Sequence, residues 1–293
     1  MNMDKLEQFL TRAEAVLARI EGMLPPAASD IDWESAVAFR WRKRQERGFL
    51  QPVTAISRIA LDDLQNIDRQ KGLIEQNTKQ FVKKQPANNV LLTGARGTGK
   101  SSLIKACLNA YSKDGLRLIE VDKEDLHDLG DIVDLISACP ERFIVFCDDL
   151  SFEEGESGYK ALKVALDGSI TAQSDNVLIY ATSNRRHLLP EYMSDNETYK
   201  HTSDGEIHPG EVVEEKISLS ERFGLWVSFY PFKQDDYLSI VDHWLKHFGC
   251  DDAEIESARG GALVWALERG SCSGRVAWQF ARDWSGRKTG PAA

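Results

Sequence analysis

The chain has 293 residues, of which 42% are apolar and 28% charged, a balance that is typical of globular proteins and excludes disordered and fibrous classes. Its five cysteines include no C-x-x-C pair, so neither a disulfide framework nor a zinc ribbon is predicted, and a reducing, cytoplasmic setting is expected. No apolar run approaches the roughly 20 residues of a membrane span, so we expect no membrane partner.

The net charge of -10 is concentrated in two segments. Residues 120–135 hold seven acids and one base, and residues 191–216 hold eight acids and two bases. The rest of the chain is close to neutral, so the total charge does not exclude a local basic face that binds nucleic acid. On charge alone, an unidentified protein partner and a nucleic-acid partner both remain open.

Residues 4–24 are predicted to form a helix because apolar residues recur at alternating spacings of four and three. This apolar stripe comprises Leu6, Leu10, Ala13, Leu17, Ile20 and Leu24. Pro25 and Pro26 end the helix. Two interpretations stay open: the stripe packs onto the protein's own body, or it forms a surface for self-association or for docking of a partner.

Residues 27–51 interleave basic and aromatic side chains. The basic ones are Arg40, Arg42, Lys43, Arg44 and Arg47, and the aromatic ones are Trp33, Phe39, Trp41 and Phe49. Aromatic rings stack on bases and arginines pair with phosphates, so residues 33–49 are a candidate for binding single-stranded nucleic acid. The alternative is an amphipathic helix that buries the rings and solvates the charges. On either interpretation, residues 1–51 are treated as a helical N-terminal segment.

From about residue 60, apolar strands alternate with amphipathic helices, which predicts an α/β fold with a mostly parallel sheet covered on both faces. The expected strands are residues 90–93, 117–121, 143–147, 177–181 and 225–230. The expected helices between them are residues 99–111, 131–138, 158–167 and 216–223. After Pro231 three helical patterns follow at residues 233–248, 252–268 and 274–284, without a strand. The chain therefore divides into residues 1–51, an α/β domain at 52–230 and a small helical domain at 231–293.

A phosphate-binding motif is the most specific signal in the sequence. The G-x-x-x-x-G-K-[ST] pattern is matched in full by Gly94, Ala95, Arg96, Gly97, Thr98, Gly99, Lys100 and Ser101, with Ser102 next. The segment follows the strand at 90–93 and opens a helix, which is the context that the motif requires. The loop would cradle phosphates with backbone N–H groups and the helix dipole, while Lys100 contacts the β and γ oxygens and the Ser101 hydroxyl binds Mg²⁺.

Two acids follow the buried strand at residues 143–147. Asp148 is predicted to hold the Mg²⁺ ion with its water shell, as a Walker B acid does. Asp149 is predicted to orient or deprotonate the water that attacks the terminal phosphate.

Together with the P-loop, four further segments resemble the AAA+ ATPase superfamily over roughly residues 60–284. The strand at 179–184 resembles sensor 1 and ends in Asn184, and residues 218–224 resemble the arginine-finger segment and contain Arg222. Residues 273–275 resemble sensor 2 and end in Arg275. Residues 64–68, with Ile67, lie where the superfamily contacts adenine. The resemblance implies a five-stranded P-loop domain of AAA+ type followed by a helical lid.

The same resemblance implies roles for individual residues. Asn184 would hold the attacking water or the γ-phosphate, and Arg275 would lie over the phosphates. Arg222 would act on the nucleotide of a neighbouring subunit, which implies a homo-oligomer arranged as a ring or open spiral. Within the superfamily, residues 88–103 and 181–188 resemble a bacterial family of predicted ATP-binding proteins whose role is unassigned. One departure is Asp149, where glutamate is commonest; a shorter side chain predicts slower hydrolysis.

The expected function is therefore ATP hydrolysis with Mg²⁺ that drives a conformational change on an unidentified macromolecular partner. The alternative is a nucleotide-controlled binding module with little turnover, whose ATP and ADP states present residues 1–51 differently. The two differ in whether a partner accelerates hydrolysis. The guanine motif N-K-x-D is absent from the sequence, so the expected base is adenine.

Overall fold

The computed structural model describes residues 3–21, 31–33, 35–44, 47–152, 157–167, 175–185, 188, 200–201, 207–208 and 220–288. Its strands are β1 (Ala38–Arg44), β2 (Arg47–Pro52), β3 (Val90–Gly94), β4 (Leu116–Glu120), β5 (Arg142–Cys147), β6 (Val177–Ser183), β7 (Lys200–His201), β8 (Ile207–His208) and β9 (Leu225–Phe229). Its α-helices are α1 (Met3–Glu21), α2 (Asp68–Val82), α3 (Lys100–Tyr111), α4 (Leu129–Ile136), α5 (Ser157–Asp167), α7 (Gln234–His247), α8 (Asp252–Glu268) and α9 (Gly274–Lys288). Short 3-10 helices are η2 (Leu61–Asp63), η3 (Ser112–Asp114) and η4 (Lys123–Asp128).

The main sheet has the strand order β2-β1-β4-β5-β6-β3-β9. Its strands from β4 to β9 are all parallel, so the expected α/β architecture is present, with helices after most strands. The C-terminal ends of β3, β5 and β6 therefore lie side by side at one edge of the sheet. That edge is where parallel α/β sheets bind ligands.

The sheet is buried on both faces because neighbouring residues of each strand point to opposite sides. In β3, Leu91 belongs to a core shared with α4 and α5, while Val90 and Leu92 belong to a second core shared with α2 and α3. All three side chains are 0% exposed. The continuous apolar run that predicted this strand is thus explained by helices covering both faces.

The sheet contains seven strands rather than the expected five, because residues 38–52 form the β1–β2 hairpin. The expectation of a wholly helical N-terminal segment is wrong here. Phe39 and Trp41 are buried, while Arg40 between them and Arg42 after them are not, which is the period of two that a strand requires. β1 pairs in parallel with β4, and β2 pairs antiparallel with β1.

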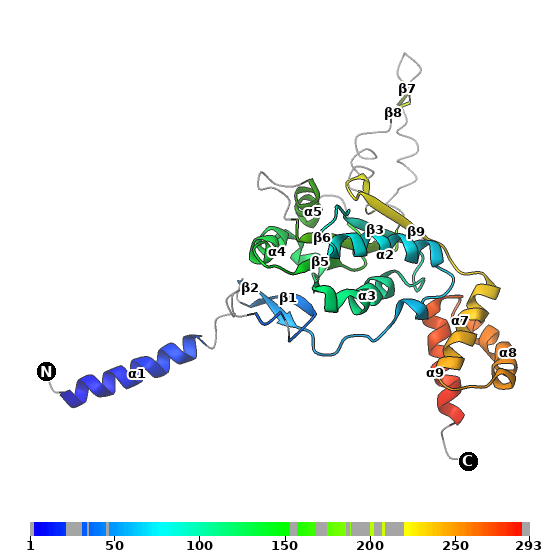
Figure 1. The fold of residues 1–293 in the computed structure, drawn as a ribbon, viewed down its shortest axis with the longest axis horizontal. Coiled ribbons are helices and arrows are strands. Elements are labelled where there is room, and N and C mark those ends of the chain that lie inside the picture. Colours follow the sequence, from blue (N-terminus) through cyan, green and yellow to red (C-terminus); the bar gives the residue numbers. More distant parts are fainter. Residues whose placement is uncertain are drawn as a thin grey trace.

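The helix α1 confirms the expected N-terminal helix, and it extends away from the body in Figure 1. Leu10, Leu17 and Ile20 are 52%, 57% and 49% exposed, so these parts of the stripe are not packed onto the protein's own body. Leu24 lies outside the described residues, as does nearly all of the acidic segment at 191–216. Within the described ranges, no helix has the length and apolarity needed to cross a membrane.

The helices α7, α8 and α9 form a small bundle at the end of the molecule opposite α1 (Figure 1). They share a core of their own, in which Tyr237, Val241 and Ala277 are 0% exposed. The Tyr237 hydroxyl donates a hydrogen bond to the carbonyl of Ala262, 3.0 Å away, which ties α7 to α8. Of the expected helix at 216–223, residues 216–219 lie outside the described residues.

Candidate functional site

The loop at residues 94–99 leads from β3 into α3 at the ligand-binding edge of the sheet. Gly94 has φ +126°, and a Cβ atom there would lie 1.9 Å from the carbonyl oxygen of Phe229, so no larger residue fits. Gly99 has φ +96° and lies directly before the first residue of α3, Lys100. The loop thus delivers the N terminus of a 12-residue helix to the edge, and its positive dipole end favours an anion there.

Lys100 is held at this edge by three acceptors. Its ammonium donates to the carbonyl oxygens of Gly94 (2.7 Å) and Ala95 (2.8 Å) and to Oδ1 of Asn184 (3.1 Å). The residue is only 6% exposed. Burial lowers the pKa of Lys100, although the carboxylates of Asp149 and Asp148 act in the opposite direction. An anionic ligand beside this partly desolvated cation would offset the cost of its burial.

Ser101 and Asp148 are in direct contact, as the sequence predicted for a shared Mg²⁺ site. The Ser101 hydroxyl donates to Oδ1 of Asp148 over 2.6 Å. Hydroxyl and carboxylate oxygens are the hard ligands that Mg²⁺ prefers, so this pair fits the ion.

The second acid, Asp149, faces Asn184. The side-chain amide of Asn184 donates to Oδ1 of Asp149. Asp149 has φ +52°, a left-handed conformation that is uncommon outside glycine and clusters at functional sites. This turn directs two adjacent acids to different partners, Asp148 to Ser101 and Asp149 to Asn184.

Thr182 is a site residue that the sequence analysis missed. Its hydroxyl donates to Oδ1 of Asp148 (2.5 Å) and accepts the backbone N–H of Asp149 (2.9 Å). The available signal was positional, since Thr182 lies near the end of β6, two residues before Asn184. Residue type gave no further signal, because threonine is common in strands.

A cavity of about 970 Å³ joins these groups, which is at the upper end of the usual size of ligand pockets. The predicted residues that line it are Ile67, Arg96, Gly97, Thr98, Gly99, Lys100, Ser101, Ser102, Asp148, Asp149, Asn184 and Arg275. Arg58 and Lys105 add positive charge, while Trp244 and Trp278 add aromatic surface. The excess of cations over acids in the lining suits a polyanionic ligand.

The helical bundle closes one side of this cavity. The N–H of Gly274, at the start of α9, donates to the carbonyl of Gly97 in the loop over 2.9 Å. Arg275 follows and lines the cavity. The bundle therefore contacts the loop directly, and a ligand in the loop would bear on the position of α9.

The turn at residues 64–67 links the same loop to α7. Ile67 is 4% exposed, and its Cδ1 lies 3.5 Å from where a Cβ at Gly99 would be. Asn66, with φ +61°, donates to the carbonyl of Asp236 (2.9 Å) and to the Ser239 hydroxyl (2.6 Å) on α7. The turn thus touches both the loop and the bundle.

Arg222 is not brought together with the other predicted residues. Arg222 is not among the described residues that line the cavity. Its Nε instead donates to Oδ1 of Asp167, at the end of α5, 2.6 Å away. Within one chain, Arg222 therefore lies away from the loop at 94–99.

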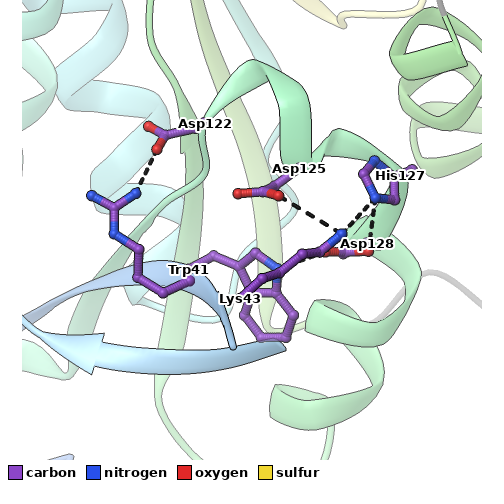
Figure 2. Close-up of polar contacts among 7 residues, drawn as sticks. Trp41, Lys43, Asp122, Asp125, His127 and Asp128 are labelled. Carbon is purple, nitrogen blue, oxygen red and sulfur yellow. Dashed lines mark hydrogen bonds and ion pairs between the residues drawn. The ribbon is translucent and has the colours of Figure 1, made fainter. Parts of the chain in front are cut away.

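Three of the four basic side chains of β1 pair with acids at the end of β4 and in the segment after it. Arg40 contacts Glu120 (2.7 Å), and Arg42 contacts Asp122 (2.6 Å). In Figure 2, Lys43 points to three side chains of η4: it lies 2.8 Å from Asp128, 3.7 Å from Asp125 and 2.5 Å from the His127 ring. These bases are neutralised within the chain.

The aromatic side chains of this region are engaged as well. Trp41 is 4% exposed, and its indole N–H donates to Asp128 over 2.8 Å. Figure 2 draws both side chains. Trp33 packs edge-on against Phe39, with ring centroids 4.8 Å apart, and Phe39 is 0% exposed. Phe39 and Trp41, which are buried in the hairpin, cannot stack on bases without unfolding it. The contacts therefore favour a structural role for residues 33–49 over nucleic-acid binding.

A family model described as "Protein of unknown function (DUF815)" matches residues 34–288. No curated protein matches the sequence. Among solved structures, the RuvB Holliday junction branch migration motor of Thermotoga maritima matches with TM-score 0.49 and 16% identity, and a single-residue variant of it with 0.50 and 14%. Each match covers 76% of this chain and 63% of the RuvB chain. The Trip13-containing HORMA:CdnC complex of E. coli MS115-1 matches with TM-score 0.42, 12% identity and coverage of 76% and 89%.

Proposed function

We propose that this chain, which belongs to the family described as "Protein of unknown function (DUF815)" and has the AAA+ P-loop fold, binds ATP with Mg²⁺ and hydrolyses it. The observation that carries the proposal is the convergence of the loop at 94–99, two adjacent acids and Asn184 on one cavity that holds a buried, partly desolvated lysine. A site built from these groups has the parts that phosphoryl transfer to water needs.

The triphosphate would be held by the loop at 94–99 and by Lys100. Lys100 donates to two carbonyls and to Asn184, and a phosphate oxygen would offer its ammonium a charged acceptor in their place. Ser101 and Asp148 would hold Mg²⁺, which supplies positive charge to the phosphate oxygens when it is bound. Arg275, on α9, would add a further donor from the bundle.

Hydrolysis would proceed by attack of water on the γ-phosphorus, with departure of ADP. Asn184 and Asp149, which contact each other, would both bind this water beside their mutual contact, and the Asp149 carboxylate would take its proton. The new P–O bond replaces the bond to the bridging oxygen, so inorganic phosphate and ADP are the products. Positioning and charge stabilisation supply most of the rate in such sites.

We propose that hydrolysis occurs in a homo-oligomer in which Arg222 acts on a neighbour's nucleotide. Arg222 is absent from the described residues that line the cavity of its own chain, and its Nε donates to Asp167 instead. An arginine supplied across an interface stabilises charge that develops in the transition state. The nucleotide would also move the bundle through the Gly97–Gly274 bond and through Asn66, and this motion would act on an unidentified macromolecular partner.

A second candidate is a nucleotide-controlled binding module with little turnover. The observation that favours it is α1, whose exposed apolar side chains include Leu10 and Leu17 and which gives the chain a surface outside the catalytic body. Asp149, with its shorter side chain, would then serve as a sensor of the bound nucleotide more than as a base.

Phosphate release from ATP by the parent protein and by Asp149→Asn separates these candidates. Asp149→Asn keeps the shape of the side chain but removes its basicity, so we expect ATP affinity within about threefold and at least about 100-fold slower turnover. Asp114→Asn, an exposed acid in η3, is the matched control and should behave like the parent. Equal turnover in Asp149→Asn and the parent would contradict the assigned base, and binding without turnover in the parent would favour the second candidate.

A further inference from the structure

Thr182 occupies the centre of the hydrogen bonds around the two acids. It lies in β6 and is 1% exposed. Its hydroxyl donates to Oδ1 of Asp148 (2.5 Å) and accepts the N–H of Asp149 (2.9 Å), and its carbonyl accepts the N–H of Leu150 (2.7 Å). One residue therefore contacts three consecutive residues at the end of β5.

These bonds hold a backbone conformation that Asp149 would not adopt by itself. A φ of +52° is disfavoured for an aspartate and persists only where the surroundings determine it. The bond from the Asp149 N–H to the Thr182 hydroxyl lies on one side of this turn, and the bond from the Leu150 N–H to the Thr182 carbonyl lies on the other. Thr182 thus fixes the turn from both sides.

The Thr182 hydroxyl also has the donor and the acceptor that its two partners require. A threonine hydroxyl has a single O–H to donate, which goes to Asp148, and a lone pair to accept the N–H of Asp149. At 1% exposure, water has no access to replace either bond. Valine has the same shape and can make neither bond, whereas serine can make both.

We propose that Thr182 is a positioning residue for the phosphoryl-transfer site: it sets the carboxylate of Asp148 against Ser101 and turns Asp149 toward Asn184. This inference rests on the proposed function, because the acids that it positions are those assigned to Mg²⁺ and to water. Thr182 lines the same cavity, but the hydrogen bonds of its side chain go to Asp148 and Asp149, so we expect it to act through the two acids.

The test compares Thr182→Val and Thr182→Ser with the parent in steady-state kinetics and in ATP titrations with and without Mg²⁺. For Thr182→Val we expect kcat to fall about 10- to 100-fold with KM nearly unchanged, because small misplacements of catalytic groups have effects of that size. Affinity for ATP without Mg²⁺ should stay within about threefold, while the gain in affinity on adding Mg²⁺ should shrink. Thr182→Ser should restore kcat and that gain to within about threefold of the parent.

Thr78→Val is the matched control for the loss of a buried threonine hydroxyl. Thr78 is 0% exposed on α2, donates to the carbonyl of Ile74 (2.8 Å) and pairs with the Tyr180 hydroxyl (3.0 Å), far from the acids in the hydrogen-bond network. We expect it to lower the thermal unfolding midpoint about as much as Thr182→Val does, with kcat unchanged.

The inference is overturned if Thr182→Val keeps the parent's kcat and the parent's gain in ATP affinity on adding Mg²⁺. It is also overturned if Thr182→Ser has a kcat and a Mg²⁺ gain no higher than those of Thr182→Val. A loss of kcat in Thr78→Val equal to that in Thr182→Val would also overturn it, since the effect would then be one of stability. If the parent binds ATP but does not hydrolyse it, the proposed hydrolysis fails. The Mg²⁺ gain in affinity alone then decides whether Thr182 positions Asp148.

Discussion

Asp128 offers a quantitative test of whether the basic and aromatic residues of β1 have a structural role. Asp128→Ala removes the acceptor of the Trp41 indole N–H and the partner of Lys43, both 2.8 Å away. Trp41 is 4% exposed, so its N–H would be left buried without an acceptor, at a cost of about 1–3 kcal/mol. Loss of the partly exposed Lys43 pair adds about 1 kcal/mol.

The expected loss is therefore about 3 kcal/mol of unfolding free energy in the α/β body, or roughly 6 to 12 °C in its thermal midpoint. Thermal and urea unfolding at neutral pH measure both quantities. Asp125→Asn is the control, since Asp125 lies 3.7 Å from Lys43 and should contribute no more than about 1 kcal/mol. A midpoint for Asp128→Ala within about 1 °C of the parent would refute the reasoning.

The same variant predicts a pH dependence. Burial raises the pKa of Asp128, but the hydrogen bonds from Lys43 and Trp41, with the charges of His127 and Lys43, together outweigh it, and the pKa is lowered from its ordinary value of 3.8. A depressed carboxylate pKa contributes stability that is present above the unfolded-state value and is lost as the pH falls through the folded-state value. The stability difference between the parent and Asp128→Ala should therefore be constant near neutral pH and shrink below about pH 4.

Arg222→Ala should leave ATP affinity within about threefold yet slow hydrolysis by up to about 10³-fold. Mixing Arg222→Ala with Lys100→Ala should restore part of the activity. If the two variants are shown to co-assemble and no activity returns, action of Arg222 across an interface is contradicted. Asn66→Ala removes both bonds to α7 and should weaken the protection of α7 from hydrogen exchange that ATP induces, whereas unchanged protection would exclude this link. Arg42→Gln should leave the fluorescence anisotropy of labelled single-stranded DNA and RNA unchanged at low salt, and a loss of binding would restore residues 33–49 as a nucleic-acid surface.

The strands and helices of the α/β body were predictable because each carries its own signal. The apolar runs at 90–93 and 143–147 are buried on both faces, and the glycines at 94 and 99 interrupt the chain where the backbone needs positive φ. The meeting of Ser101 with Asp148 also followed from the sequence, since the ends of parallel strands share one edge. Local pattern and tertiary structure agree in this part of the chain.

The hairpin at 38–52 was missed because its exposed residues are closely spaced arginines and a lysine, and an amphipathic helix would expose such residues to solvent as well. The acidic segment at 120–128 favours a strand over a helix here, because it supplies partners for Arg40, Arg42 and Lys43. That segment lies some 80 residues later in the sequence. The role of Thr182 was equally hidden. Its partners, Asp148 and Asp149, reach it only through the pairing of β5 with β6, which no local pattern encodes.

Isothermal calorimetry of ATP with the parent and with Lys100→Ala tests the central claim, that the loop at 94–99 and its buried lysine form a nucleotide phosphate site. The claim predicts binding by the parent and at least tenfold weaker binding by Lys100→Ala, a difference of about 1.4 kcal/mol. Lys79→Ala, which removes an exposed lysine of α2, should bind as the parent does. Equal affinity in the parent and Lys100→Ala would contradict the claim.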